Sequence, residues 1–204
     1  MTGARRLVAI TGPDGAGKST ICTAIAGQLG AVEVSVWDSL GRGGPFASKA
    51  EVLAAVSELD GVERMLTIFD LLRRAMRLAA EEGAETLVLN GYWYKYAASE
   101  LAYGVPEAAV AAAVKDFPVP ACTFFLDLGA DEAWRRKGVG SAYERGLMRG
   151  THRPAGRTPG EQFVEFQRKI RGHWEALERA HGPWTRISTA PPVDRVLAHI
   201  EGGL

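Results

Sequence analysis

Glycine, lysine and hydroxyl residues near the amino terminus occur at the spacing that binds a polyphosphate. Gly12, Gly17, Lys18 and Ser19 fit the pattern G-x-x-x-x-G-K-[ST]. The glycines let backbone N–H groups turn toward anionic oxygens, the lysine supplies a point charge for the β- and γ-phosphates, and the serine hydroxyl is a ligand for Mg²⁺. We therefore expect a nucleoside triphosphate, taken as ATP, and Mg²⁺ to bind here. The residues expected to contact ATP are Gly12, Pro13, Gly15, Ala16, Gly17, Lys18, Ser19 and Thr20.

The motif also lies between a strand and a helix, which is the context that this chemistry requires. Residues 6–10 form a short apolar run, and apolar side chains four apart between residues 18 and 29 predict one buried helix face. The start of that helix adds a positive dipole end to the site. The same periodicities predict further strands at 32–37, 86–90, 122–128 and 184–188, and further helices at 48–59, 61–82, 92–103, 106–117, 159–180 and 193–200, with a short one from 130.

Strands that alternate with helices favour a parallel sheet, because parallel neighbours need a crossover that a helix usually forms. We therefore expect an α/β protein with a three-layer P-loop NTPase fold, in which a five-stranded parallel sheet carries helices on both faces. One domain spanning residues 1–204 is the simplest division of the chain. A glycine- and arginine-rich segment at about 135–157 interrupts the helical pattern and is expected to form a basic lid.

Composition bears on the compartment and on the partners. The chain has 24 Lys and Arg residues against 24 Asp and Glu residues, so no net charge points to nucleic acid or to an acidic membrane. Cys22 and Cys122 lack a metal-binding spacing and are expected to pack as small apolar side chains. The first apolar run is too short for a signal sequence, and no window approaches the ~20 apolar residues of a membrane span. We expect a cytoplasmic protein with no membrane partner.

Other features separate the classes of triphosphate-binding protein. The chain has no N-K-x-D segment of the kind that reads the base in GTPases, and its third strand ends in NGYWYKY rather than in an acidic cluster. Asp14 lies inside the phosphate loop, LAYG occurs at 101–104, and FFLDLGADEAWRRKG at 124–138 runs into the arginine-rich segment. In this order, these features resemble the thymidylate kinase family of nucleoside monophosphate kinases.

The resemblance implies roles for several residues. In the family, the acid of the phosphate loop lies near the phosphate acceptor, and this position is Asp14 here. The long helix before the third strand supplies an arginine toward the acceptor phosphate. Arg73, Arg74 and Arg77 match that arginine, and Arg74 is the preferred one.

The resemblance also implies a mobile basic lid that closes over the phosphates. Neutralising the transferring group in a dry site is the main catalytic task of phosphoryl transfer, although a solvated loop is the ordinary role of a charged run. Among the lid cations we prefer Arg145 and Arg149, which join Lys18 and Asp14 as the expected catalytic residues. The lid cations are Arg135, Arg136, Lys137, Arg145, Arg149, Arg153 and Arg157.

The third strand departs from the family pattern. Thymidylate kinases end this strand in Asp-Arg-Tyr or Asp-Arg-His, whereas this chain has Asn90, Gly91 and Tyr92. Asn90 is still expected, with Ser19, in the metal site, because its carbonyl oxygen can bind a metal-bound water; it carries no charge. Gly91 removes a guanidinium that would bind phosphate as a fork. The acceptor is therefore expected to differ from thymidylate.

Four further residues are candidates for the acceptor site, together with Asp14 and Arg74. Asp38 follows the second strand, where ligands of parallel sheets bind, and is expected either to orient an acceptor hydroxyl as a general base or to form a turn. Arg42, in the glycine-rich loop that follows, is a candidate for an acceptor phosphate. Tyr92 and Tyr96 lie four residues apart and either stack on a base or pack in the core.

These features predict Mg²⁺- and ATP-dependent phosphoryl transfer to a small-molecule acceptor, with a nucleoside monophosphate preferred. A kinase of a non-nucleotide metabolite shares every feature that binds ATP. A regulatory protein that binds nucleotide without turnover is the non-enzyme alternative, suggested by the uncharged third-strand end. A nucleic-acid end kinase is disfavoured by the neutral net charge. Because the resembled family often dimerises, a homodimer is one expected option.

Overall fold

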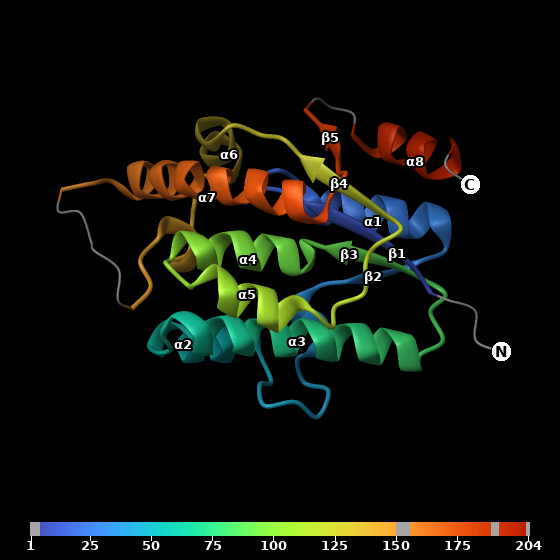
Figure 1. Ribbon diagram of the computed structural model, residues 1–204, viewed down its shortest axis with the longest axis horizontal. Helices are drawn as coiled ribbons and strands as arrows, with labels where there is room; N and C mark the ends of the chain where they lie inside the picture. Colours follow the sequence, from blue (N-terminus) through green and yellow to red (C-terminus); the bar gives the residue numbers. More distant parts are fainter. Residues whose placement is uncertain (1–4, 150–155, 189–191, 203–204) are drawn as a thin grey trace.

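The central sheet is seen in the computed structural model, which describes residues 5–149, 156–188 and 192–202 (Figure 1). Within these residues, five strands pair in the order β2-β3-β1-β4-β5, and every neighbouring pair is parallel. The predicted five-stranded parallel sheet is confirmed. The chain fills one side of β1 first and then crosses to the other, so β1 ends at the point where ligands bind in such sheets. The strands are β1 (Arg6–Thr11), β2 (Val32–Val34), β3 (Thr86–Asn90), β4 (Cys122–Leu126) and β5 (Thr185–Ile187).

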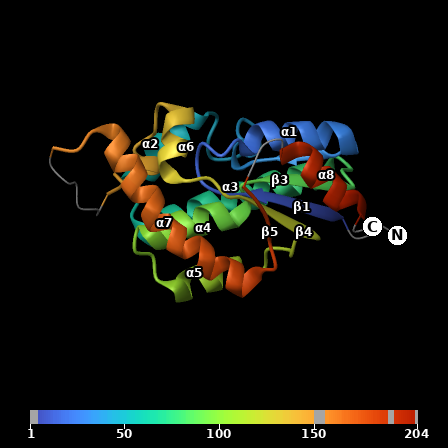
Figure 2. The same cartoon turned by 90° about the horizontal axis from the view of Figure 1, so that it is seen from above.

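Helices cover both faces of this sheet. Side chains alternate along β1, so Leu7 and Ala9 enter one apolar core while Val8 and Ile10 enter another. Figure 2 shows α1 and α8 on one side of the sheet and α4, α5 and α7 on the other. The three-layer α/β architecture is therefore confirmed. The helices of the smaller layer are α1 (Lys18–Leu29) and α8 (Pro192–Gly202); those of the larger layer include α3 (Gly61–Glu81), α4 (Tyr92–Ala102), α5 (Glu107–Val114) and α7 (Pro159–His181).

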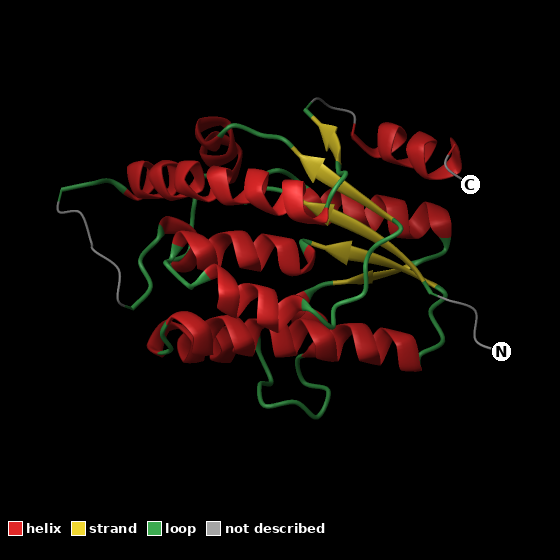
Figure 3. Cartoon of the chain, in the orientation of Figure 1, coloured by secondary structure: helices red, strands yellow, loops and turns green. Residues whose placement is uncertain are grey.

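Most predicted boundaries agree with the structure to within a few residues, and Figure 3 shows the helices and strands that result. The second strand is the main exception. It was expected at 32–37 but stops at Val34, because Ser35 begins a short 3₁₀ helix, η1 (Val36–Ser39). The Asp38 carboxylate accepts the Ser35 backbone N–H at 2.5 Å, and the Ser35 hydroxyl accepts the Trp37 N–H at 3.3 Å. These local side-chain hydrogen bonds compete with the hydrogen bonds that would continue the strand, and the strand ends at Val34.

The segment expected to be the lid connects two helices. It begins at the end of α6 (Ala130–Lys137), includes the short helix η2 (Tyr143–Arg145), and leads to α7, where Thr158 and Glu161 form a capping box. Residues 150–155, including Arg153, lie outside the described residues. Helix α2 (Lys49–Glu58) is in contact with the end of this segment, because Arg149 donates to the Glu58 backbone carbonyl at 2.9 Å.

A buried ion pair joins α3 to α4. The Arg64 guanidinium donates to both carboxylate oxygens of Glu100, from Nε at 3.0 Å and from Nη2 at 2.7 Å. The Tyr143 hydroxyl of η2 donates to the same carboxylate at 3.0 Å, and the guanidinium lies 4.6 Å from the Tyr103 ring centre. This cluster fixes η2 to the helical layer. In the part of the chain that the structure describes, no helix has the length and hydropathy needed to cross a membrane.

Candidate active site at the carboxyl end of the sheet

The phosphate loop connects β1 to α1 at the carboxyl end of the sheet. Gly12 has φ +137°, and a Cβ there would lie 2.7 Å from the Leu126 carbonyl oxygen. Gly15 has φ +88°, and its Cβ would lie 2.6 Å from the Ala133 carbonyl oxygen. Neither position accepts a side chain without moving backbone, so the loop must be built on glycine. The backbone curl that the motif predicts is therefore present.

Lys18 is folded back onto this loop. Its Nζ donates to the Gly12 carbonyl at 2.9 Å and to the Pro13 carbonyl at 2.7 Å. Burial, and then the positive charge of Lys95, lower the pKa of Lys18 to about 7. Phosphate oxygens would satisfy this ammonium better than neutral carbonyls, because charge-assisted hydrogen bonds are the stronger kind. The loop holds the lysine ready for an anion.

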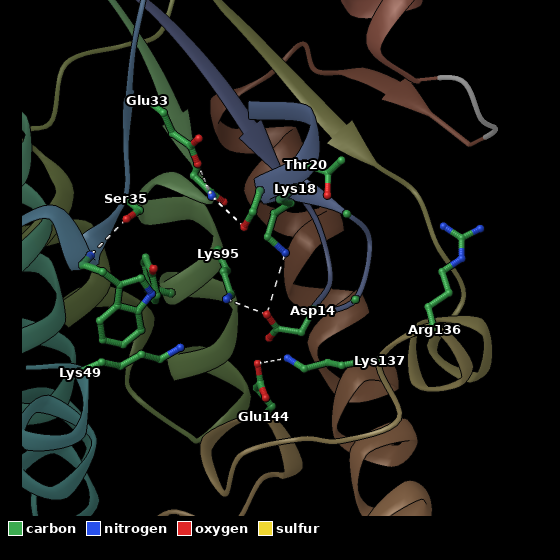
Figure 4. Close-up of a pocket in the computed structure, with 16 residues that line it drawn as sticks. Asp14, Lys18, Thr20, Glu33, Ser35, Lys49, Lys95, Arg136, Lys137 and Glu144 are labelled. Carbon is green, nitrogen blue, oxygen red and sulfur yellow. Dashed lines mark hydrogen bonds and ion pairs between the residues drawn. The ribbon is translucent and has the colours of Figure 1, made fainter. Parts of the chain in front are cut away.

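Asp14 and Lys95 form an ion pair at the front of the loop. Lys95 Nζ, on α4, lies 2.7 Å from Asp14 Oδ1, and Lys18 Nζ lies 4.0 Å from the same oxygen (Figure 4). Burial alone would raise the pKa of Asp14, but the charges of Lys95, then Lys18 and Lys137, hold it below its ordinary value. Burial likewise opposes the charge on Lys95, but Asp14 raises the pKa of that lysine. Both groups are therefore charged at neutral pH.

A second polar group lies at the start of α1. The Asn90 amide nitrogen, at the end of β3, donates to the Ser19 hydroxyl at 3.0 Å and to Glu33 Oε1 at 2.8 Å. Glu33 Oε2 accepts the Thr23 hydroxyl of α1 at 2.7 Å. A carboxylate only accepts hydrogen bonds, so the nitrogen and not the oxygen of the Asn90 amide must face Glu33. Ser19, Asn90 and Glu33 thus form a connected chain beside the phosphate loop.

These groups line a cavity of about 530 Å³ that opens over the phosphate loop. A second cavity, of about 270 Å³, continues from it between η1, α2, α3 and the lid, and its wall is mostly apolar. Six residues line both cavities and mark the junction between them. They are Trp37, Lys49, Lys95, Tyr96, Lys137 and Glu144.

Four of the predicted acceptor residues, Asp38, Arg42, Arg74 and Tyr92, line neither cavity. Asp38 caps η1, so it forms a turn, which was the alternative to its expected role as a general base. Arg42 is paired with Glu82 on the surface, and the Arg74 guanidinium donates to the Arg42 backbone carbonyl. Arg42 and Arg74 therefore tie the glycine-rich loop to α3, and their binding of an acceptor phosphate stays a prediction that the cavity lining does not support.

The two tyrosines have different surroundings. Tyr92 is fully buried, its hydroxyl donates to the Pro118 carbonyl at 2.5 Å, and its ring packs against Trp93 and Phe117. It is a core residue, which corrects its assignment to the acceptor site. Its backbone has φ +45°, so it does not share the ideal helical face on which the pairing with Tyr96 was based. Tyr96 lines both cavities, as the acceptor prediction requires.

The lid places different cations at the site from those expected. The Arg145 guanidinium donates to Gln162 at 3.1 Å, and Arg149 donates to the Glu58 carbonyl at 2.9 Å. Neither lines the two cavities, so the preference for them as catalytic residues is not supported. Instead, Arg136 and Lys137, from the end of α6, line the larger cavity. α6 ends there because Gly138 adopts a left-handed conformation.

Several cavity residues were not predicted from the sequence, and Glu33, Lys49 and Lys95 are three of them. Glu33 had a usable signal, because strand alternation places it on the α1 face and parallel pairing sets it opposite Val88, two residues before Asn90. Lys95 lies one helical turn after Gly91, within the aromatic run YWYKY, and that run gives no sign that the lysine faces the site. Lys49 lies 4.8 Å from the Trp37 ring centre, a contact that no local pattern predicts.

Comparison with known proteins supports the fold. No protein-family model matches the chain, and no curated protein matches it either. Among solved structures, a deoxyadenosine kinase from M. mycoides with bound dATP has a TM-score of 0.59 at 13% sequence identity, covering 97% of this chain and 100% of that one. The chain has a three-layer P-loop NTPase fold of the kind found in that nucleoside kinase.

Proposed function

We propose that this protein is a Mg²⁺- and ATP-dependent phosphotransferase with a small-molecule acceptor, acting as one domain over residues 1–204. The observation that carries the proposal is the junction of the two cavities. A phosphate loop lines the first cavity, an apolar wall lines the second, and Lys95 lies between them. That arrangement suits a triphosphate on one side, an acceptor ring on the other, and phosphoryl transfer where they meet.

The loop and the lysines would bind the triphosphate of ATP. Loop N–H groups and Lys18 would hold the β- and γ-phosphates, and Arg136 and Lys137 would approach from the lid side. Lys95 would exchange part of its contact with Asp14 for the transferring phosphoryl group, whose charge it would stabilise. The acceptor hydroxyl oxygen forms a bond to the γ-phosphorus as the bond to the β-bridging oxygen breaks. Glu144 lines both cavities and is the proposed acceptor of the hydroxyl proton.

The residues present fit a magnesium ion. Among the described residues, no group of three or more His, Cys, Asp and Glu side chains could hold a metal on its own. Mg²⁺ bound with a nucleotide needs no such cage, because one or two protein oxygens, phosphates and waters complete its shell. The Ser19 hydroxyl, held on the cavity wall by Asn90, would be the protein ligand. When bound, Mg²⁺ would neutralise negative charge on the phosphates of ATP.

The apolar cavity bears on the acceptor. Its wall includes Val52, Val56, Ile68 and Leu71, and no arginine lines it among the residues that the structure describes. This supports an uncharged hydroxyl compound with a ring, of which a nucleoside is the proposed example. A nucleoside monophosphate is the second candidate, favoured by the resemblance and by Lys49, whose ammonium lies over Trp37 at the junction without a carboxylate partner in the described chain.

Turnover of ATP with a panel of acceptors tests the proposal. Purified protein with Mg²⁺ and ATP is offered nucleosides, nucleoside monophosphates and unrelated hydroxyl metabolites, and ADP and phosphorylated product are measured. We expect product with at least one ring-bearing acceptor and none from Lys18→Ala. Binding of ATP without transfer to any acceptor would favour a regulatory protein instead. Failure to bind ATP would overturn the proposal.

A further inference from the structure

Among the described residues, Glu33 is the carboxylate of the larger cavity that forms no ion pair. We propose that Glu33 supplies the negative charge that holds the water shell of Mg²⁺ beside Ser19, a role that the uncharged Asn90 at the end of β3 cannot fill. The inference rests on the proposed function. It assigns to β2, at the edge of the sheet, a group that acts on the metal at the loop.

Strand geometry brings Glu33 to the metal side of the cavity. β2 pairs with β3 in parallel, with Glu33 opposite Val88, so the Glu33 side chain is on the same sheet face as Val88 and Asn90. The Asn90 amide then bridges Glu33 Oε1, at 2.8 Å, and the Ser19 hydroxyl, at 3.0 Å. Both Glu33 and Ser19 line the larger cavity. The carboxylate is therefore linked, through the Asn90 amide, to the residue that would ligate the ion.

Charge sets Glu33 apart from the other acids of the cavity. Within the described residues, the carboxylates that line the larger cavity belong to Asp14, Glu33 and Glu144. Asp14 is paired with Lys95, and Glu144 with Lys137. Glu33 forms no ion pair within the described ranges and accepts hydrogen bonds only from neutral Asn90 and Thr23. Each carboxylate oxygen has two lone pairs, so both oxygens keep capacity for metal-bound water.

A structural role is the competing explanation. Glu33 could do no more than join β2 to α1 through its 2.7 Å hydrogen bond with Thr23. The two roles differ in whether they need the charge of Glu33. Joining β2 to α1 needs only hydrogen bonds, whereas holding the water shell of Mg²⁺ needs the negative charge. Glu33→Gln separates them, because glutamine can accept from Asn90 and donate to the Thr23 hydroxyl while remaining neutral.

The experiment measures how much Mg²⁺ tightens the binding of ATP. The dissociation constant of ATP is determined by calorimetry with Mg²⁺ and with a chelator in its place, for the parent protein and for each variant. Loss of an outer-shell group typically weakens metal affinity about 10- to 100-fold. We expect Glu33→Gln to reduce the tightening by that factor while leaving Mg²⁺-free binding within about twofold. Thr23→Val, which removes the hydrogen bond to Glu33 and keeps the charge, should leave the tightening unchanged.

A second variant tests the position of the charge. Glu33→Gln combined with Asn90→Asp moves the carboxylate to the end of β3 and is expected to restore most of the tightening. Unchanged tightening in Glu33→Gln, or an equal loss in Thr23→Val, would overturn this inference alone. A parent protein that binds ATP neither with nor without Mg²⁺ would overturn the proposed function and this inference with it.

Discussion

The buried pair of Arg64 and Glu100 provides the sharpest test of how the helical layer is held together. The exposed fractions of the two side chains are 1% and 0%, and the guanidinium contacts both carboxylate oxygens. Burial opposes the charge on Arg64, but the hydrogen bonds to Glu100 and the negative charge of Glu100 together raise the pKa of Arg64, so this guanidinium stays charged in the folded protein. Glu100→Gln keeps the shape of the side chain but leaves the guanidinium buried without a counter-charge.

The size of the effect follows from that burial. Breaking a fully buried pair by removing one partner costs about 3–5 kcal/mol of the free energy of unfolding. For a chain of this size, 1 kcal/mol shifts Tm by about 2–4 °C, so Glu100→Gln should lower Tm by about 6–20 °C. Replacing both partners, as in Arg64→Met with Glu100→Leu, removes the unpaired charge. That double variant should lose less stability than Glu100→Gln, although the Tyr143 hydroxyl loses its acceptor.

Urea denaturation followed by circular dichroism measures these differences, with thermal melts as a second readout. Asp131→Asn is the matched control, because it breaks an ion pair with Arg168 whose side chains are 65% and 74% exposed. Such a surface pair contributes about 0–1 kcal/mol. A loss below about 1 kcal/mol for Glu100→Gln, or a double variant less stable than that single one, would refute the reasoning.

Three further predictions concern the loop and its lysines. The pKa of Lys18 is lowered to about 7 from 10.5, so ATP binding at pH 8 should take up a proton and should weaken as the pH rises. Calorimetry in two buffers of different ionisation heat measures this proton uptake. Binding without proton uptake would contradict the lowered pKa. Lys95→Met should lower kcat about 10²- to 10³-fold, with partial retention in Lys95→Arg, whereas an unchanged kcat would exclude Lys95 from transition-state stabilisation. Gly91→Ala places a Cβ 3.2 Å from Lys95 Cδ in a residue with φ +87°. It should lower the free energy of unfolding by more than Gly83→Ala, which has a similar φ but open space around the new Cβ and should cost ~1–2 kcal/mol. Equal losses of stability in the two variants would show that the contact with Lys95 has no effect.

Local sequence patterns predicted the layers and the phosphate loop. Strands such as Thr86–Asn90 and helices such as Lys18–Leu29 were found with their exact or nearly exact bounds, because apolar periodicity is a property of a few consecutive residues. The phosphate loop was predictable for the same reason: its glycines, lysine and serine are close in sequence. The predicted end of the second strand was wrong because Ser35 and Asp38 form a capping box. The local hydrogen bonds of this box outweighed the alternation of Val32, Val34 and Val36.

The acceptor side of the site could not be predicted in the same way, because its side chains come from distant elements. Whether an arginine faces a cavity depends on its competing partners: Glu82 holds Arg42, and Gln162 holds Arg145. The spacing of Tyr92 and Tyr96 suggested a shared face, but the first tyrosine begins the helix in a non-helical conformation and enters the core. Tertiary contacts of this kind leave no periodic signal in the sequence.

The uncharged end of β3 can be understood from its neighbours. Gly91 has no side chain, and the nearest atoms to a Cβ there belong to Lys95, so the missing side chain leaves room for Lys95 to reach Asp14. Asn90 has no charge, and its amide nitrogen instead reaches the Glu33 carboxylate on the adjacent strand. A positive and a negative group thus remain beside the phosphate loop, although neither belongs to β3. If this compensation holds, Asn90→Asp should be tolerated best when Glu33 is already neutral, because two adjacent carboxylates at one 2.8 Å contact would repel each other.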